Sequence, residues 1–431
     1  MSQTFELPLS RLSHRAQRAE GQPIASLMQQ ALAHPELISL AAGFVDQETL
    51  PVELTSEVLN SLLSDPRRGR AALQYGNAAG DPRLREMVLD RMCQDDGTSA
   101  SAANLSTDQV VVTAGSNQFL HLIADTLLDP GDIVLCATPT YFAYMGALAN
   151  LGARSYGVPT DEHGLIPEAL KEELQRIEAA GELHRVKAIY VVSYFDNPAG
   201  MTLSLDRRPQ IVEIAKRWSK KQHIFVIDDA AYRELRYFGD DVPTLRAFDE
   251  AGDTVIVAQT FSKSFSPGIR VGWGVLPPAL VEPVLNQKGN IDFGSPNFSQ
   301  HLMAEVLGSG KYEQHVIALR DSYRKKQAAM VDAADEFFAP LEGVQYVKPD
   351  GGLYLWLQLP DSIDTGSEGE FYANALREGV LYVPGIYCYP TEGAPRHNNM
   401  MRLSFGVQSP ERIREGMRLL ANAAQQVVAT S

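Results

Sequence analysis

The sequence has little cysteine and no long apolar run, and each shortage excludes a class of protein. Its three cysteines, Cys93, Cys136 and Cys388, lie far apart and form neither a CxxC pair nor a cluster with histidine. We therefore expect no disulfide framework and no zinc site. No apolar run approaches the roughly 20 residues of a membrane helix, and the polar segment Met1–Arg18, broken by Pro8, lacks the apolar core of a signal peptide. These absences predict a soluble, cytoplasmic protein.

Positive charge is also scarce, with 38 basic against 53 acidic residues and a formal charge of −15. A nucleic-acid binder needs concentrated lysine and arginine, so this class is not expected. The only basic tract, Arg67–Arg70, is interpreted as a solvated loop. The 431 residues, 45% of them hydrophobic, are enough for about two or three domains with a large core.

No repeat or low-complexity tract interrupts the chain, and its middle part has a regular organisation. Short apolar runs alternate with amphipathic segments such as the one that aligns Leu120, Ile123 and Leu127 on one helical face. This alternation predicts a mostly parallel sheet covered by helices on both faces. The apolar runs are Val110–Ala114, Ile133–Cys136, Lys187–Ser193, Ile224–Asp228, Thr254–Ala258 and Val271–Val275.

Beyond about Pro296 the pattern changes to a smaller α+β type. A helical stretch, Gln300–Phe337, precedes strand-like segments at Tyr346–Lys348, Leu353–Leu357, Leu381–Val383 and Met401–Phe405. The prediction is a three-part chain: residues 1–50 form an N-terminal arm that contributes to the small domain and has a helix around Ile24–His34, residues 51–299 form the large domain, and residues 300–431 form the small C-terminal domain.

In a parallel α/β sheet, ligands bind outside the carboxyl ends of the strands. Five polar residues lie at or just beyond such ends: Ser116, Asn197, Asp229, Tyr232 and Lys263. We therefore expect a functional site there.

The segment from Thr260 to Trp273 is the most informative. Lys263 follows a buried strand in a hydroxyl-rich turn, where an amine can be held as a nucleophile. Thr260 and Ser262 supply hydroxyl groups, and Arg270 supplies a planar fork suited to phosphate. The alternative is a surface loop with an ordinary lysine.

Ser262-Lys263, followed by Pro267-Gly268 and Arg270, resembles the cofactor-lysine motif of class I/II aminotransferases, which are fold-type-I pyridoxal-phosphate enzymes. The resemblance runs from about residue 38 to 420. It implies a seven-stranded, mostly parallel sheet plus a small α+β domain, with pyridoxal 5′-phosphate held by Lys263 as a Schiff base.

Two further segments resemble the motifs that hold the pyridine ring. Asp229 and Tyr232 match the family's Asp-x-x-Tyr, which implies that Asp229 pairs with the ring nitrogen and that Tyr232 donates to the ring oxygen. The spacing to Tyr232 favours Asp229 over its neighbour Asp228. Asn197 begins an Asn-Pro-x-Gly turn whose asparagine contacts the same oxygen and lies beside the substrate.

Other matches concern the phosphate and the ring face. Ser116 and Asn117 lie in the strand-to-helix turn that cradles the phosphate in the family, where glutamine is commoner than Asn117. A simple helix cap by Ser116 is the other reading. Tyr141 matches the aromatic residue stacked on the ring. Tyr75 matches the tyrosine that reaches the cofactor of a neighbouring subunit, which implies a homodimer with shared sites.

Two residues resemble substrate contacts. Arg402, in Met401–Phe405, matches the arginine that binds the α-carboxylate. Gly43 stands where the family usually reads Gly-Gly-x-Pro, so the N-terminal wall of the pocket departs from the pattern.

The resemblance implies an aminotransferase that moves an amino group between an amino acid and a 2-oxo acid by a ping-pong mechanism. Other pyridoxal-phosphate reactions on this fold, carbon–sulfur lysis or decarboxylation, are alternatives, and an effector-sensing module without catalysis is a remote one. Neither metal nor nucleic acid is expected as a partner.

Tyr382, Tyr387 and Tyr389 lie in a region near the family's side-chain pocket. They favour aromatic or large aliphatic amino acids, with substrates of the 2-aminoadipate or valine–pyruvate type as alternatives. Core packing of these tyrosines is equally compatible with the sequence. A dicarboxylic substrate would need a second arginine, for which Arg15 and Arg18 are the N-terminal candidates.

Overall fold

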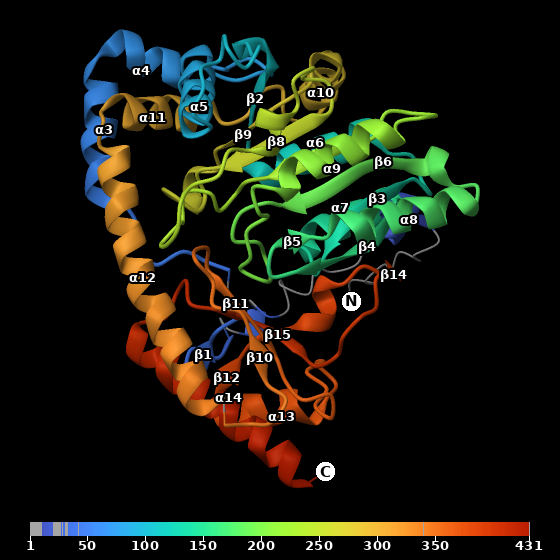
Figure 1. The fold of residues 1–431 in the computed structure, drawn as a ribbon. Coiled ribbons are helices and arrows are strands. Elements are labelled where there is room, and N and C mark those ends of the chain that lie inside the picture. Colours follow the sequence, from blue (N-terminus) through green and yellow to red (C-terminus); the bar gives the residue numbers. More distant parts are fainter. Residues whose placement is uncertain are drawn as a thin grey trace, which may run out of the picture.

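The computed structural model describes residues 11–19, 27, 29–30, 33–41, 43–338 and 340–430. In Figure 1 a large sheet with its helices lies above a smaller mixed part, and α12 (Tyr312–Phe337) runs along one side of both. Most of the helix predicted around Ile24–His34 lies outside the described residues.

The described residues form a nine-stranded sheet that contains a strand at each of the six predicted apolar runs. The expected number of seven strands is too low, because the two-residue strands β14 (Glu392–Gly393) and β5 (Gly164–Leu165) add to the seven longer ones. Neighbouring strands are parallel, except that β9 is antiparallel to both of its neighbours and β5 to β4, so the predicted α/β fold class is confirmed. One strand of full length, β4, was not predicted, because polar residues, Gly157 and Pro159 interrupt its apolar positions. In spatial order the strands are β14 (Glu392–Gly393), β4 (Arg154–Asp161), β3 (Ile133–Thr138), β6 (Val186–Val192), β7 (Phe225–Asp229), β8 (Val255–Thr260), β9 (Gly272–Val275) and β2 (Val110–Thr113), with β5 (Gly164–Leu165) paired to β4.

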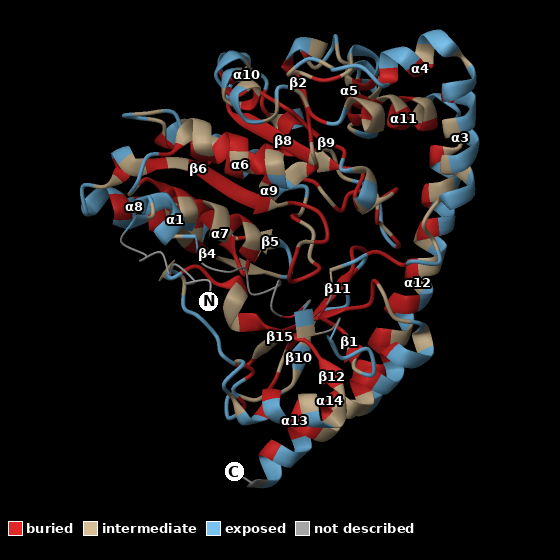
Figure 2. Cartoon of the chain, turned by 180° about the vertical axis from the view of Figure 1, so that it is seen from behind, coloured by how far each residue is buried: buried red, intermediate tan, exposed pale blue. Residues whose placement is uncertain are grey.

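Both faces of this sheet are buried, as the continuous apolar runs predict. In β3, Ile133 and Leu135 pack into one core while Val134 and Cys136 pack into the other, because successive side chains point to opposite faces. Figure 2 shows the central strands β6 and β8 mostly in the colour of buried residues. One face is covered by α6 (Ser116–Leu127), α7 (Phe142–Leu151) and α10 (Pro278–Asp292), and the other by α5 (Pro82–Asp95), α8 (Pro167–Ala179), α9 (Arg207–Trp218) and α11 (Asn297–Gly308).

The segments before α5 include α1 (His14–Gln17), α3 (Val52–Ser64) and α4 (Pro66–Ala72). The interpretation of Arg67–Arg70 as a loop is wrong, since these residues lie within α4. Asp65 caps that helix by accepting the backbone N–H of Arg67 at 2.9 Å, and Pro66 occupies its first position, where proline needs no hydrogen bond.

The predicted single helical stretch Gln300–Phe337 is also wrong, because it is divided into α11 and α12. Gly310, between them, has a φ of +70°, which a helix does not accommodate. α11 packs in the core of the large sheet, whereas Met330 and Ala334 of α12 pack in the core of the smaller part.

The smaller part of the described chain has a four-stranded antiparallel sheet in the order β10 (Gln345–Tyr346), β11 (Tyr354–Gln358), β15 (Met400–Ser404) and β13 (Val383–Pro384). A parallel pair, β1 (Ile38–Ser39) with β12 (Val380–Leu381), ties the N-terminal segment to this part. Its remaining helices are α13 (Glu370–Glu378) and α14 (Pro410–Thr430). No helix among the described residues is long and apolar enough to span a bilayer.

Candidate active site

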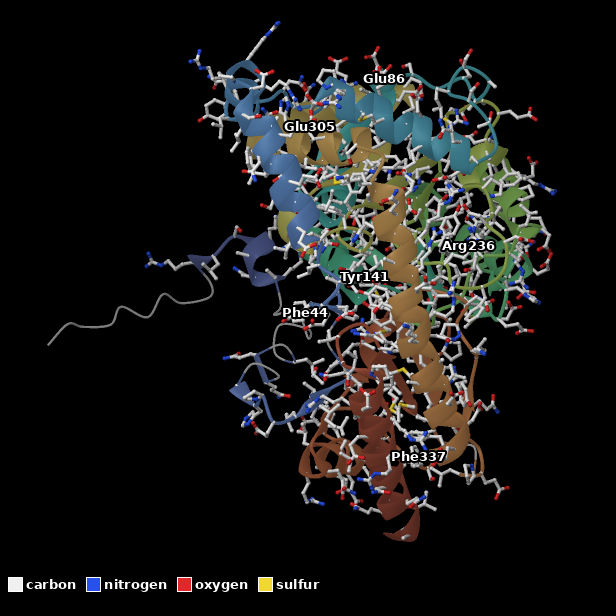
Figure 3. All side chains as sticks on the ribbon, turned by 90° about the vertical axis from the view of Figure 1, so that its left-hand side faces the viewer. Phe44, Glu86, Tyr141, Arg236, Glu305 and Phe337 are labelled. Carbon is white, nitrogen blue, oxygen red and sulfur yellow. The ribbon has the colours of Figure 1, made fainter. Side chains whose placement is uncertain are left out.

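A cavity of about 170 Å³ opens at the carboxyl ends of the parallel strands. Segments from both parts contribute to its wall, and Figure 3 labels Phe44 and Tyr141 at this junction. All of the predicted site residues except Tyr75 and Arg402 line this cavity. The predicted residues that line it are Gly43, Ser116, Asn117, Tyr141, Asn197, Asp229, Tyr232, Thr260, Ser262, Lys263 and Arg270.

Lys263 lies in the turn that follows β8, and its side chain is half-buried. Its amine donates a hydrogen bond of 2.8 Å to the carbonyl oxygen of Gly43. Burial lowers the pKa of this amine, and the positive charges of Arg402 and Arg270 lower it further. No carboxylate of the described residues forms an ion pair with it. The lowered pKa increases the share of the neutral amine, which is the nucleophilic form.

Asp229 ends β7 and is 4% exposed. Its carboxylate accepts the hydroxyl of Tyr190 at 2.8 Å and the backbone N–H of Ala231 at 3.3 Å. Burial raises the pKa of Asp229 to about 6, because no cation among the described residues pairs with it. Asp228 points away, accepting hydrogen bonds from Ser193 and from the backbone of Leu245. Strand alternation thus directs Asp229, and not Asp228, into the cavity.

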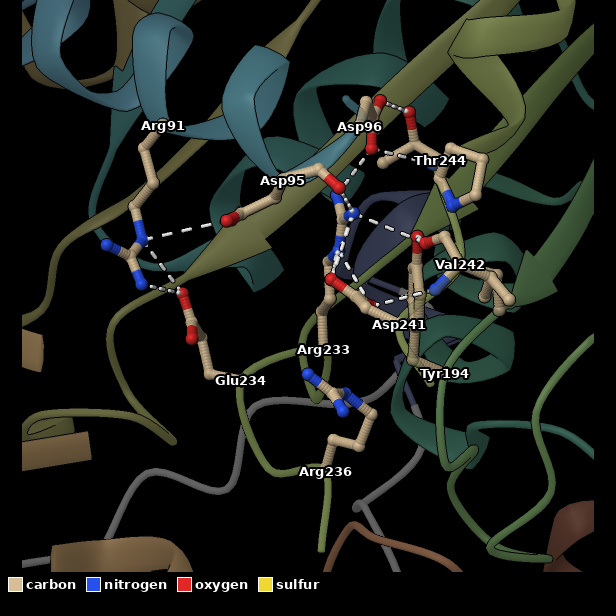
Figure 4. Close-up of polar contacts among 12 residues, drawn as sticks. Arg91, Asp95, Asp96, Tyr194, Arg233, Glu234, Arg236, Asp241, Val242 and Thr244 are labelled. Carbon is tan, nitrogen blue, oxygen red and sulfur yellow. Dashed lines mark hydrogen bonds and ion pairs between the residues drawn. The ribbon is translucent and has the colours of Figure 1, made fainter. Parts of the chain in front are cut away.

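The segment that carries Asp229 and Tyr232 is anchored by the next residue, Arg233, as Figure 4 shows. This buried guanidinium donates to the carboxylate of Asp96 at 2.7 Å and to the carbonyl of Asp95 at 2.8 Å, both at the end of α5. A buried arginine with charged and backbone acceptors fixes the chain around it. The cavity-lining side chains of this segment are therefore held by contacts outside the cavity.

One corner of the cavity is built for an anion. α6 begins at Ser116 after Gly115, which caps it without a side-chain hydrogen bond, so Ser116 is not the cap. The first N–H groups of that helix and its dipole face the corner. The hydroxyl of Thr260 donates to that of Ser262 at 2.9 Å, and Arg270 approaches the same Ser262 oxygen at 3.4 Å.

Gly115 is required for the approach of Arg270, which donates to the carbonyl of Ala114 at 3.0 Å. Gly115 has a φ of +85°, and a Cβ at this position would lie 2.5 Å from a guanidinium nitrogen. A residue with a side chain would displace the arginine from the anion corner.

Tyr141 and Asn117 form a pair in the cavity wall, at the starts of α7 and α6. The hydroxyl of Tyr141 donates to the side-chain oxygen of Asn117 at 3.2 Å. Burial raises the pKa of Tyr141 to about 12, so the phenol remains protonated. The hydrogen bond fixes the orientation of the Tyr141 ring at the cavity.

Arg402 does not line the cavity but lies behind Asn197, which does. Its guanidinium donates to the Asn197 side chain and to the carbonyl of Ala41, each at 2.8 Å, and it lies over the ring of Tyr354 at 4.4 Å. It is 1% exposed, its Nε has no partner, and no carboxylate of the described residues pairs with it. A buried arginine in this state lacks a counter-charge that a ligand can supply.

Tyr75 is also outside the cavity, with 85% of its surface exposed and its ring 6.3 Å from that of Phe293. Within this chain it contacts no other predicted site residue.

The three tyrosines near residue 384 do not line the cavity either. The hydroxyls of Tyr382 and Tyr387 donate to Thr365 and Ser367, and Tyr389 packs on Trp356. The packing interpretation is therefore the one that fits. Arg15 and Arg18 also lie elsewhere, bonded to residues of α6 and α7.

Several residues in or directly behind the cavity wall were missed from the sequence. Phe44 and Val45 add apolar surface beside Gly43. Tyr190 shows a weak sequence signal, as a polar aromatic within an apolar strand. Tyr354, next to Tyr232, has none, because only the packing of the smaller part on the sheet brings it there.

Together these groups match a ligand with two anionic groups and one buried cationic group. Arg270 and the start of α6 suit one anion, Arg402 suits another, and Asp229 lacks a cation. Lys263 suits covalent attachment to a carbonyl carbon. The described residues contain no group of side chains able to hold a metal ion.

Comparison with known proteins identifies the family of this chain. The family model for class I and II aminotransferases matches residues 35–420. Aromatic-amino-acid aminotransferase 1 of Thermococcus litoralis is 33% identical over 91% of this chain and 88% of its own length. The 2-aminoadipate transaminase of Thermus thermophilus is 32% identical over 92% of each chain. The crystal structure of Pyrococcus horikoshii kynurenine aminotransferase, with PMP, KYN and KYA, superposes with a TM-score of 0.87, 32% identity and 97% coverage of both chains.

Proposed function

This chain belongs to the class I and II aminotransferases, and we propose the reaction that it catalyses. It transfers the amino group of an L-amino acid to a 2-oxo acid with pyridoxal 5′-phosphate as cofactor, in two half-reactions that give ping-pong kinetics. One observation carries the proposal: the amine of Lys263 and the buried carboxylate of Asp229 share one cavity, and neither has an oppositely charged partner among the described residues.

The described residues fit the cofactor group by group. Ser116 at the start of α6 and Arg270 would hold the phosphate, together with the hydroxyls of Thr260 and Ser262. Asp229 would pair with the protonated ring nitrogen, which supplies the cation that this carboxylate lacks.

The remaining ring contacts come from three cavity residues. Tyr232 and Asn197 would hydrogen bond to the ring oxygen, and Tyr141, kept in place by Asn117, would stack on the ring face. When bound, pyridoxal phosphate withdraws electrons from the substrate's Cα and makes its proton acidic.

Lys263 has two roles in this scheme. Its amine would hold the cofactor through the aldehyde carbon. Once the substrate amine has taken that place, the freed Lys263 amine would accept the Cα proton and hold it for return. A lowered pKa suits a general base, because more of the amine is unprotonated near neutral pH. Arg402 holds the substrate carboxylate and so orients the Cα–H bond toward Lys263.

The substrate side chain would meet an apolar surface. Phe44 and Val45 line the cavity, and beyond Lys263 and Arg270 no cationic side chain of the described residues does so. Aromatic or large aliphatic amino acids therefore suit it better than a substrate with a second carboxylate. The names of the aromatic-amino-acid and kynurenine aminotransferases among the relatives point the same way.

We also propose that the protein is a cytoplasmic homodimer. Tyr75, Leu73 and Phe293 are 85%, 71% and 75% exposed, and Tyr75 packs beside Phe293. Exposed apolar groups of this size favour burial against a partner. In a dimer, Tyr75 of one copy would reach the phosphate corner of the other.

Borohydride reduction of the protein loaded with pyridoxal phosphate tests the central assignment. Mass spectrometry of the digest should find the pyridoxyl group on Lys263. Lys288, which is fully buried and paired with Asp292 at 2.9 Å, serves as the unlabelled control. Label on another lysine, or none, would contradict the assignment.

A panel of amino acids then tests the reaction. We expect the cofactor band to shift to the aminated form, a 2-oxo acid to be released, and the band to return when a second 2-oxo acid is added. Release of ammonia with a thiol, or of carbon dioxide, would instead indicate lyase or decarboxylase chemistry.

A further inference from the structure

Tyr354 has no role in the chemistry described so far, yet it lies at the centre of the site. It is the first residue of β11 and is 1% exposed. Its hydroxyl oxygen lies 3.2 Å from that of Tyr232, and the two rings meet edge to face at 5.8 Å. A Cβ on Gly43 would be 2.8 Å from the Tyr354 hydroxyl, so this hydroxyl abuts the backbone whose carbonyl accepts the Lys263 amine.

The charges around the two phenols decide the direction of their hydrogen bond. Burial by itself raises the pKa of Tyr354, but Arg402 and Lys263 beside it reverse this and hold that pKa below its ordinary value. Burial and the neighbouring Tyr354 raise the pKa of Tyr232 well above its ordinary value. The 3.2 Å contact admits either hydroxyl as the donor, and the more acidic phenol is the better donor, which favours donation from Tyr354 to Tyr232. The Tyr232 proton then remains free to be donated into the cavity.

We propose that Tyr354 is a positioning residue that donates a hydrogen bond to Tyr232 and thereby strengthens the hydrogen bond that Tyr232 donates into the cavity. The inference rests on the proposed function, in which Tyr232 donates to the ring oxygen of pyridoxal phosphate. Consecutive hydrogen bonds polarise one another, so a donor behind Tyr232 makes Tyr232 a better donor. If the ring oxygen accepted a stronger hydrogen bond from Tyr232, it would attract the proton on the Lys263 nitrogen less, and that proton would be released at a lower pH.

The test is a pH titration of the visible absorbance of the protein loaded with pyridoxal phosphate. In Tyr354→Phe the ring still packs on Arg402 but the hydroxyl is lost. We expect the midpoint of this titration to rise by about 0.5 to 1 pH unit, which means that the Lys263 nitrogen binds its proton about threefold to tenfold more tightly. Replacing Tyr354 by 3-fluorotyrosine, a more acidic phenol, should lower the midpoint.

The titratable and charged groups that face Tyr354 and Lys263 are Tyr141, Tyr232, Arg270, Tyr323, Cys388 and Arg402, and all of them are retained in Tyr354→Phe. Tyr372→Phe is the matched control, because Tyr372 is also buried and loses one hydrogen bond, to Gln30, away from the cavity. Its midpoint should equal that of the wild type.

A double-mutant cycle tests the route through Tyr232. In a Tyr232→Phe background, adding Tyr354→Phe should leave the midpoint unchanged, because no donor remains for Tyr354 to polarise. Equal midpoints for wild type and both Tyr354 replacements would overturn the inference, as would additive shifts in the double variant. A wild type that shows no cofactor band would instead refute the proposed function.

Discussion

Replacing Asp229 by asparagine should stabilise the protein without cofactor at neutral and alkaline pH. The carboxylate is 4% exposed and has no cation partner among the described residues, so its charged form is unfavourable in the folded state. Asparagine has nearly the same shape, carries no charge and still accepts the Tyr190 hydroxyl. A residue that we assign to cofactor binding therefore reduces the stability of the empty protein.

The magnitude follows from the pKa of Asp229, which rises from 3.8 to about 6 on folding. Because the folded protein holds this proton more tightly than the unfolded chain, the contribution to stability is complete below about pH 4 and is lost as pH rises through 6. This pKa shift changes the free energy of unfolding by about 3 kcal/mol in total, and about 1.5 kcal/mol of that change occurs between pH 5 and pH 8.

The assay is thermal unfolding of wild type and Asp229→Asn without cofactor, at one protein concentration and several pH values between about 5 and 8. For 431 residues the unfolding entropy makes 1 kcal/mol worth about 1 °C. The variant's advantage in Tm should therefore grow by about 1.5 °C over this range. If the Tm values of the two proteins changed in parallel with pH, the reasoning would be refuted.

Adding pyridoxal phosphate should reverse the order of stability. Wild-type Asp229 then acquires a cationic partner and the asparagine variant does not, so the cofactor should raise the Tm of the wild type more. An equal rise in both proteins would show that Asp229 does not pair with the ring nitrogen.

Three further predictions concern other parts of the molecule. Arg402→Lys should raise KM for the amino acid about tenfold to a hundredfold, because a lysine cannot bind a carboxylate with two parallel hydrogen bonds; steady-state kinetics will test this, and an unchanged KM would exclude a carboxylate contact. Arg270→Lys should weaken binding of pyridoxal phosphate about tenfold, measured by equilibrium titration of the empty protein, since the fork that faces the phosphate corner is lost. Gly274→Ala should destabilise the protein by about 1 to 3 kcal/mol in urea unfolding, because its Cβ would lie 2.0 Å from the ring of Phe119. In contrast, Gly289→Ala, within α10 and with open space at its Cβ, should be neutral or stabilising.

The core elements of the large sheet could be predicted from sequence because their signal is local. Runs such as Ile133–Cys136 are apolar throughout, and a strand buried on both faces needs that composition. β4 and the break between α11 and α12 were missed for the opposite reason: mixed polar residues in one and a glycine turn in the other weaken the periodic signal.

The sequence by itself determined which groups stand at the strand ends. Lys263 follows β8, Asp229 ends β7, and the turn before Ser116 begins a helix, all through local patterns of a few residues. These patterns sufficed to identify the family and to predict the chemistry at the sheet edge.

Only the tertiary structure decided how the distant parts complete the site. Arg402 reaches Asn197 across 205 positions, Lys263 reaches Gly43 across 220, and Tyr354 reaches Tyr232 across 122. No local periodicity encodes such pairs, because they depend on how the smaller part packs against the edge of the large sheet. The same packing leaves Asp229 and Arg402 buried and Lys263 half-buried, and none of the three has a counter-charge among the described residues. The pKa shifts of Asp229 and Lys263 follow from that burial.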